Sequence, residues 1–534
     1  MTKNTIEQNW LDKLYTFVAP VKAAERYKAR VTLAMASSYS GASRTRRSLS
    51  EFIPSSGDAD SDLIYDLPLL RQRSRDLLRN NPLALGAVNT VCTSVIGTGL
   101  TLQSRIDRDF LGLSDKEADS WEANTEREFR LWAESTDCDA GRHLTFAQLQ
   151  SLVFRSTLEN GDCFVLLSFI DRPTSPYALA LQIIEADRVC NSNHQSDSDT
   201  LVAGVQKDKY GAPVSYHILK THPGNRSSQP RQWQIIPAFS RCGTRRQILH
   251  VYKVVRPGQT RGVPYLAPVI EALKQLGSYT DAEIMAAVVS SYFTVFVKTP
   301  TGDADLAPMS LSNSKAATND NYALGNGAII GLAEGEDITT ANPGRPNAQF
   351  DPFIQAILRQ IGVALELPFE LLIKHFTASY SAARAALLEA WRFFMTQRTW
   401  LAQQFCQKVY EAWLLEAVLL GRIQAPGFVS GDTAIRAAFL GSQWTGTAPG
   451  QIDPLKEIQA ARERISLGVS TLSRETAMLT GEDWEKTHKQ TVKEQRMRQH
   501  DNIPTEDDTK NSSIKPSFQP EENTNDEELS DVND

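Results

Sequence analysis

The stretch that decides the fold runs from residue 350 to residue 420 and reads FDPFIQAILRQIGVALELPFELLIKHFTASYSAARAALLEAWRFFMTQRTWLAQQFCQKVYEAWLLEAVLL. Apolar side chains recur every three or four positions from Phe350 to Leu365, which predicts one buried helical face. Pro368 ends this helix, because proline disfavours the helical conformation in the residue before it. A second apolar pattern continues without proline over residues 381–420 and corresponds to about 60 Å of helix. The stretch is therefore predicted to form a helix, a loop and an unusually long helix.

The predicted loop, residues 368–380, joins two rigid helices and carries polar and basic side chains. Long loops between rigid elements often have a functional role. We therefore take eight of its residues as candidate site residues: Phe369, Glu370, Lys374, His375, Phe376, Thr377, Ser379 and Tyr380.

Another long helix is expected over residues 264–298, separated from the helix at 348–367 by a polar, glycine- and proline-rich insertion, residues 299–347. An insertion of this kind cannot form much of a core by itself. The two helices beside it keep apolar faces that need neighbours. A closed ring of identical subunits would cover those faces.

The composition is that of an ordinary soluble protein: 534 residues, 41% hydrophobic, 22% charged and a net charge of -7. Most of that charge lies at the C-terminus, where residues 501–534 hold eleven acidic residues and two lysines. This tail is expected to be disordered. The other 500 residues are close to neutral, which is less basic than usual for a protein that grips DNA tightly.

Six scattered cysteines form no C-x-x-C pair, so a zinc or redox motif is not indicated and a reducing compartment is favoured. We see no secretory signal, and the most apolar run, residues 286–297, is too short to span a membrane.

The N-terminal half combines helices with a sheet. Residues 1–66 form a basic arm, interpreted either as a partly ordered surface arm or as a contact for a polyanion. Helices are expected near residues 67–95, 117–134 and 146–158, followed by short runs rich in β-branched and aromatic residues that predict a small, mostly antiparallel sheet. The fold class is therefore α+β.

A catalytic or metal site is not indicated in the sheet region. His217, His222 and His250 lie among Glu185, Asp187 and Cys190, but none has the spacing of a known ligand motif. No nucleophile–base pair or paired carboxylates stand out either. We expect no enzyme activity, no metal and no cofactor.

Several segments resemble the portal proteins of lambda-type tailed phages: LPFELL, SYSAARAA and LLEAWRFF in the central stretch, and IEADRV and RPGQTRGVPYLAPVI before it. The similarity extends over roughly residues 69–481. It implies a portal layout with the following parts: wing 67–263, first stem helix 264–298, clip 299–347, second stem helix 348–367, tunnel loop 368–380, long wing helix 381–420, helical crown 421–499 and acidic tail 500–534.

The resemblance also implies a function: a dodecameric ring at one capsid vertex of the virion, assembled in the host cytoplasm. Such a ring nucleates the procapsid with the major capsid and scaffold proteins, docks the terminase large subunit, passes double-stranded DNA and later joins the head–tail connector. Lys298 and Arg359 then become candidates for lining the channel, together with Lys374 and His375 of the loop. Two alternatives stay open, another structural ring such as a connector or tail tube, and a phage-encoded nuclease or protease.

Overall fold

The computed structural model describes residues 17, 19–35, 40–42, 46–54, 56–226, 230–241, 243, 245–291, 295–298, 337–340, 349–376, 379–429, 432–450 and 453–501. The chain divides into two units, Met1–Asp62 and Leu63–Asp534. In the first unit the structure describes helix α2 (Pro20–Met35) and the 3-10 turn η1 (Ser40–Ala42). Helix α3 (Ala59–Leu63) lies at the division between the units.

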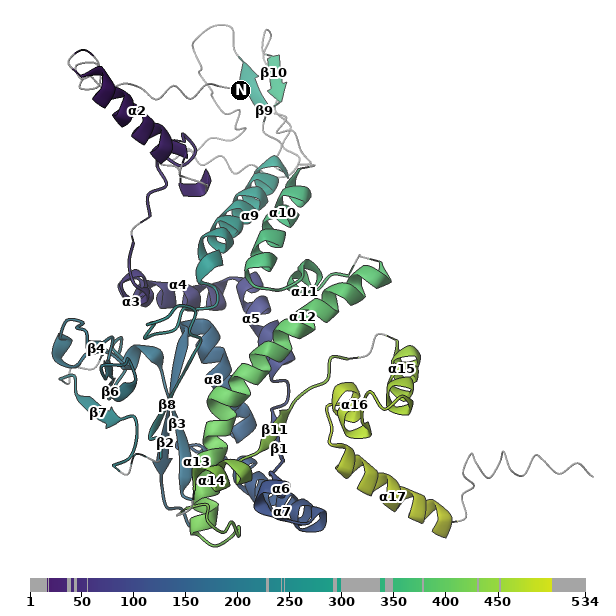
Figure 1. Ribbon diagram of the computed structural model, residues 1–534. Helices are drawn as coiled ribbons and strands as arrows, with labels where there is room; N and C mark the ends of the chain where they lie inside the picture. Colours follow the sequence, from purple (N-terminus) through teal and green to yellow (C-terminus); the bar gives the residue numbers. More distant parts are fainter. Residues whose placement is uncertain are drawn as a thin grey trace, which may run out of the picture. The chain divides into compact units, whose positions relative to one another are not determined.

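The described part of the second unit mixes helices with small antiparallel sheets, which confirms the α+β class (Figure 1). Its α-helices are α4 (Leu67–Asn80), α5 (Pro82–Val95), α6 (Arg108–Leu111), α7 (Asp115–Ala133), α8 (Phe146–Asn160), α9 (Ile270–Ser291), α10 (Phe350–Ala364), α11 (Phe369–Ile373), α12 (Tyr380–Leu401), α13 (Gln407–Leu419), α14 (Thr433–Phe439), α15 (Pro454–Ser466), α16 (Leu472–Leu479) and α17 (Trp484–His500). Shorter helical turns are η2 (Thr136–Cys138), η3 (Ala186–Arg188), η4 (Ser192–His194), η5 (Ala267–Val269) and the π-helical η6 (Ala402–Cys406).

The strands of the described residues form four antiparallel sheets. They are β1 (Thr101–Ser104), β2 (Asp162–Phe169), β3 (Leu179–Ile184), β4 (Leu201–Val202), β5 (Val205–Lys207), β6 (Pro213–Leu219), β7 (Trp233–Pro237), β8 (Ile248–Tyr252), β9 (Val295–Lys298), β10 (Asp337–Thr340) and β11 (Ser442–Thr445). One sheet has the order β3-β2-β8 and another the order β4-β5-β6-β7. The pair β1–β11 joins segments more than 300 residues apart, with Thr101 opposite Thr445.

Helix starts follow local sequence signals. Asn81 caps α5, because its side-chain oxygen accepts hydrogen bonds from the backbone N–H groups of Leu83 and Ala84, both at 3.0 Å. Pro82 occupies the first helical position, where a missing N–H costs nothing. Helix α7 starts with a capping box between Ser114 and Glu117.

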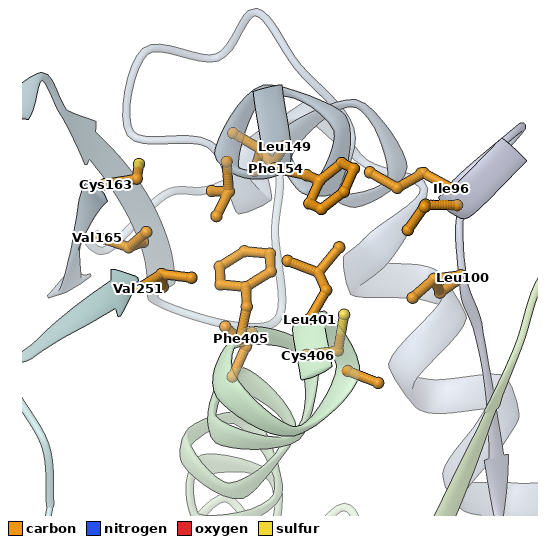
Figure 2. Packing of buried hydrophobic residues seen from close by; sticks show 14 of the residues in the cluster. Ile96, Leu100, Leu149, Phe154, Cys163, Val165, Val251, Leu401, Phe405 and Cys406 are labelled. Atoms are coloured by element: carbon orange, nitrogen blue, oxygen red, sulfur yellow. The ribbon is translucent and has the colours of Figure 1, made fainter. Parts of the chain in front are cut away.

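The main core forms around one long rod made of α12, η6 and α13 (Figure 1). Figure 2 shows Leu401 and Phe405 of this rod pointing toward Phe154 of α8 and Ile96 beyond α5. The side chains of Val165 and Val251, from β2 and β8, reach the same cluster. The rod therefore joins the N-terminal helices to the three-stranded sheet.

The rod contains a feature that the sequence did not predict. Where a continuous helix is expected over residues 381–420, the five residues of η6 are π-helical. A π segment holds one residue more than the α-helix it interrupts. Ala402, Phe405 and Cys406 of this segment are buried, whereas Gln403 and Gln404 are exposed.

The first long helix is shorter than expected. The prediction of a helix over residues 264–298 is wrong at its C-terminal end, because Val295–Lys298 forms strand β9 and pairs with β10. The run Val-Phe-Val favours a strand, since β-branched and aromatic side chains suit a pleated surface. Of the insertion at 299–347, only residues 337–340 are described, and the tail beyond Asp501 lies outside the described residues. Within the part of the chain that the structure describes, every helix is too short or too polar to cross a bilayer.

Candidate functional site

The candidate loop follows α10 and contains a short helix, α11, that the sequence did not predict. Gly362 allows the chain to reverse direction between α10 and α11. Any larger residue would be too close, because a Cβ atom at this position would lie 2.6 Å from the carbonyl oxygen of Leu367. The N–H of Leu367 donates back to the carbonyl of Gly362 at 2.9 Å. The chain then turns into α11, where Leu372 is buried against the core.

Two of the predicted site residues come together at this turn. The guanidinium of Arg359 lies over the ring of Phe369, 5.0 Å from its centre, a cation–π contact. Arg359 also donates a hydrogen bond to Gln355, one helical turn before it, at 3.0 Å. Its side chain therefore joins α10 to α11 while remaining exposed.

The loop after α11 presents its side chains to solvent. Lys374, His375 and Phe376 are exposed, and Lys374 adopts a left-handed backbone with φ of 55°. The carbonyl of Glu370 accepts a hydrogen bond from the N–H of His375 at 3.1 Å. Ser379 caps α12 through the N–H of Ala382.

Thr377 and the side chain of Tyr380 lie outside the described residues. Lys298 is described only as part of strand β9, opposite Asp337. The roles assigned to these positions stay predictions.

Helices α9 and α10 lie side by side (Figure 1). Tyr279 of α9 stacks on Phe350 of α10, with ring centres 5.6 Å apart, and meets Phe353 edge-on at 5.3 Å. Large apolar side chains of this pair remain exposed, including Ile284, Met285 and Val363, the last at 82%. Exposed apolar side chains on a helix pair are candidates for a contact with another molecule.

A buried ion cluster fixes the segment that leads into α9. The carboxylate of Asp162 is fully buried and accepts hydrogen bonds from Arg71 at 2.8 Å and from Arg261 at 2.5 Å. His250 Nε2 lies 3.2 Å from the same carboxylate. Arg261 also donates to the carbonyls of Val189, Ala203 and Ala186.

The charges in this cluster depend on each other. Burial alone would raise the pKa of the Asp162 carboxyl, but Arg261 and Arg71 outweigh it and hold that pKa far below its ordinary value. Burial lowers the pKa of the His250 imidazole, only partly opposed by its hydrogen bond to Asp162. The cluster therefore contains a charged aspartate between two arginines, with a neutral histidine favoured beside it.

The backbone is equally tight at this place. A Cβ atom on Gly262 would lie 1.9 Å from the carbonyl oxygen of Gly161, so both positions need glycine. Tyr265, three residues later, donates its hydroxyl to the carbonyl of Leu365 at the end of α10. The ion cluster, the glycine contact and Tyr265 together position both long helices and, through them, the candidate loop.

Sequence reasoning did not find this cluster. Arg261 lies in the RPGQTRGVP segment and Asp187 in IEADRV, so the motifs were visible but their role was not. The residues concerned are up to 190 positions apart, and only the fold brings them together.

Residues considered for a metal site do meet, but with cations among them. Glu185, Asp187 and His222 bring their ligand atoms within 4.8 Å of one another. Arg75 lies 3.2 Å from Glu185, and Arg71 lies 3.3 Å from Asp187. Guanidinium groups at these distances compete with a metal ion for the carboxylates, so the arrangement favours an ion-pair cluster.

Residues 45–398 match the family model described as phage portal protein, lambda family. The chain belongs to the lambda family of phage portal proteins. This confirms the resemblance seen in the sequence. Portal proteins of this family are structural components of the virion at its portal vertex, and this chain is one of them.

Curated relatives agree with this family. The chain is 26% identical over 462 residues to portal protein B of Escherichia phage lambda, covering 83% of this chain and 86% of that protein. It is 25% identical over 461 residues to the portal protein of Escherichia phage N15, with the same coverage. A probable portal protein of a Halomonas phage is 24% identical over 430 residues, 78% of this chain and 77% of that one.

Solved structures with a similar chain come from a gene transfer agent. A chain from the neck of its native particle, computed with C12 symmetry, is 14% identical with a TM-score of 0.41 over 77% of this portal protein and 92% of that chain. A chain from the virion of the native particle is 13% identical with a TM-score of 0.42, at the same coverage.

Proposed function

We propose that this portal protein forms a closed ring in which α9 and α10 of each copy stand around an axial channel for double-stranded DNA. The observation that carries the proposal is the exposed apolar surface of the helix pair, with Ile284, Met285 and Val363 uncovered in a single copy. Identical neighbours cover such faces when their rotation closes a ring. The ring is taken to be a dodecamer with the wing, clip, tunnel loop and crown at the ranges proposed from the sequence, and with α9, which ends at Ser291, as the first stem helix.

The loop at residues 368–380 is proposed to face the DNA in that channel. Lys374 and His375 are exposed, and the rigid turn at Gly362 and the Arg359–Phe369 contact hold the start of the loop in place. A single lysine and a histidine per copy hold phosphates weakly, which suits DNA that has to move. Terminase, capsid, scaffold and connector proteins are proposed as partners on the outer parts of the ring.

Electron microscopy of the purified full-length chain tests the ring. We expect hollow particles with a central opening, and a folded single copy at high concentration would overturn the proposal. Deleting residues 369–380 tests the loop separately: rings should persist, whereas retention of packaged DNA should fail. Normal packaging by that variant would remove the loop from the mechanism and leave the ring untouched.

The role is proposed to be structural, without catalysis by this chain. Ser192 lies 3.1 Å from His217 Nδ1, which is the spacing of a nucleophile and a base. Among the described residues, however, no carboxylate contacts that imidazole to orient it. Incubation of the purified ring with DNA or casein and a divalent metal should give no hydrolysis, and hydrolysis that a Ser192→Ala variant loses would overturn this part.

A further inference from the structure

Helix α17 exposes a stripe of cations along one face. Lys489, Lys493, Arg496 and His500 follow one another at intervals of four, three and four residues, which places them in one row. They border a hollow together with Val492, Met497 and one acidic residue, Asp501. Below, these four residues are called the α17 stripe.

The neighbouring face of α17 is already engaged. Lys486 lies 3.2 Å from Glu126 of α7, and Asp483 caps the helix. Thr487, Gln490 and Glu494 line a cavity of about 890 Å³ whose opposite wall includes Phe129 and Phe146. The stripe residues do not line that cavity.

Three of the four stripe residues lack an ion-pair partner among the residues that the structure describes, whereas His500 Nδ1 lies 3.0 Å from Asp501. No carboxylate of the described ranges forms an ion pair with Lys489, Lys493 or Arg496. Like charges three and four residues apart on a helix repel each other. An anionic segment bound along the row would remove that repulsion.

The chain carries such a segment directly after the helix. Residues 502–534 hold ten acidic residues and two lysines, and the first acidic triplet is Glu506-Asp507-Asp508. An extended chain covers at most about 3.3–3.6 Å per residue, so seven residues reach about 23–25 Å. That is about the length of the 17-residue helix itself. The triplet can therefore reach every cation of the row.

We propose that the α17 stripe binds the acidic segment 502–534 of its own chain. A short tether gives the segment an effective concentration in the millimolar range. The segment thereby occupies cations that would otherwise bind DNA phosphates. This inference does not depend on the proposed channel, because both binding groups belong to one copy.

Carbodiimide coupling tests the contact, because it joins an amine to a carboxylate only where the two touch. Full-length protein is assembled from a mixture of unlabelled and 15N-labelled copies, coupled, digested and analysed by mass spectrometry. We expect Lys489 or Lys493 to be linked to the acidic triplet Glu506-Asp507-Asp508. Both linked peptides should carry the same isotope, and the links should disappear in high salt. Links of mixed isotope, or none at all, would overturn the assignment to the same chain.

Binding of a short DNA duplex provides the second test. Removal of residues 502–534 should tighten duplex binding about tenfold or more at low salt, because freed cations release counterions from DNA. The triple change Lys489→Gln, Lys493→Gln and Arg496→Gln should cancel that gain. A control, Arg462→Gln, Arg474→Gln and Arg498→Gln, removes three exposed charges outside the stripe, one of them on α17 itself, and should preserve it. A gain that survives the stripe variant, or no gain, would contradict the proposal.

Discussion

Asp162 is the residue on which the junction between the sheet and the long helices depends. Its carboxylate is fully buried between Arg71 and Arg261. Removing one partner of a buried ion pair leaves uncompensated charge, which typically costs about 3–5 kcal/mol. Asp162→Asn should therefore lower the free energy of unfolding by about that amount, measured by chemical denaturation.

A matched control comes from an exposed ion pair. Asp115 lies 2.8 Å from Arg108 at the surface, where water screens the interaction. Asp115→Asn should leave the denaturation midpoint almost unchanged. Equal losses in the two variants would show that burial does not decide the contribution of Asp162.

The same cluster predicts a dependence of stability on pH. The folded pKa of His250 is depressed, so the unfolded chain binds its proton more readily and stability falls as pH drops through about 6.5. The folded pKa of Asp162 is also depressed, so its contribution is complete above about pH 4 and is lost below it. Both groups therefore lower the stability of the folded protein as the pH falls.

Unfolding curves between pH 8 and pH 3, in steps, measure this dependence. His250→Gln should remove much of the decline around pH 6 and keep the loss at lower pH. A curve of the same shape in the variant would assign the titration to another group.

The pairing of individual charged residues was the feature least predictable from the sequence. In the sequence, Arg71 lies in a region where helices are expected, and His250 is one of three histidines without the spacing of a ligand motif. Neither position indicates that the two residues meet at Asp162. Charged residues separated by many positions give no periodic signal, so only their proximity in the fold reveals their shared role.

At the scale of elements, the turn between α10 and α11 depends on Gly362. A methyl group there would meet the Leu367 carbonyl, which is backbone and cannot rotate away. Gly362→Ala should destabilise the protein by about 1–3 kcal/mol, within the usual range for a mutation that strains a packed site.

Gly277 in α9 serves as the control. The nearest atom to an added Cβ atom there, outside the helix, is the Asn81 side chain at 3.9 Å. Gly277→Ala should therefore be neutral or stabilising by up to about 1 kcal/mol, because alanine favours helix. Thermal unfolding of both variants measures the contrast. If the two substitutions changed the melting temperature by the same amount and in the same direction, the steric argument would be wrong.

Elements were more predictable than residues, with two instructive exceptions. Apolar periodicity and Pro368 led to α10 and the start of the loop, but α11 is only five residues long and leaves too short a pattern to recognise. The strand β9 was merged with the helix before it because its apolar residues continue the same run. Periodicity cannot separate a buried helix from a strand over so few residues.

At the scale of the whole molecule, the exposed apolar side of α10 predicts how assembly can be disrupted. Val363 is 82% exposed in one copy, so a charge there should not disturb the fold. In the proposed ring, the same charge would be buried against a neighbour and cost several kcal/mol without a partner.

Val363→Asp is therefore expected to fold normally and to assemble poorly, measured by mass photometry and by circular dichroism. Gln360→Asp changes an exposed residue nearby to the same side chain and provides the control. Normal rings from both variants would exclude this side of α10 from the contact between copies.

The overall class and family were the most predictable features. They depend on long amphipathic helices and on several motifs spread over most of the chain, and such signals survive errors in any one element. The match over residues 45–398 agrees with that reading.

The π-helical segment η6 gives the long rod one spare residue. Its flanking helices keep their facing sides, with Leu401 before it and Val409 and Trp413 after it all fully buried. Deleting the exposed Gln404 should convert the π-helical segment to an ordinary α-helix without rotating α13. Rings should still form. Deleting one residue after the segment, such as Lys408, would instead turn the remaining helix by about 100° and expose Trp413. The π-helical segment is thus a place where the rod can lose a residue without turning the helix that follows, and the melting temperatures of the two deletions measure that tolerance.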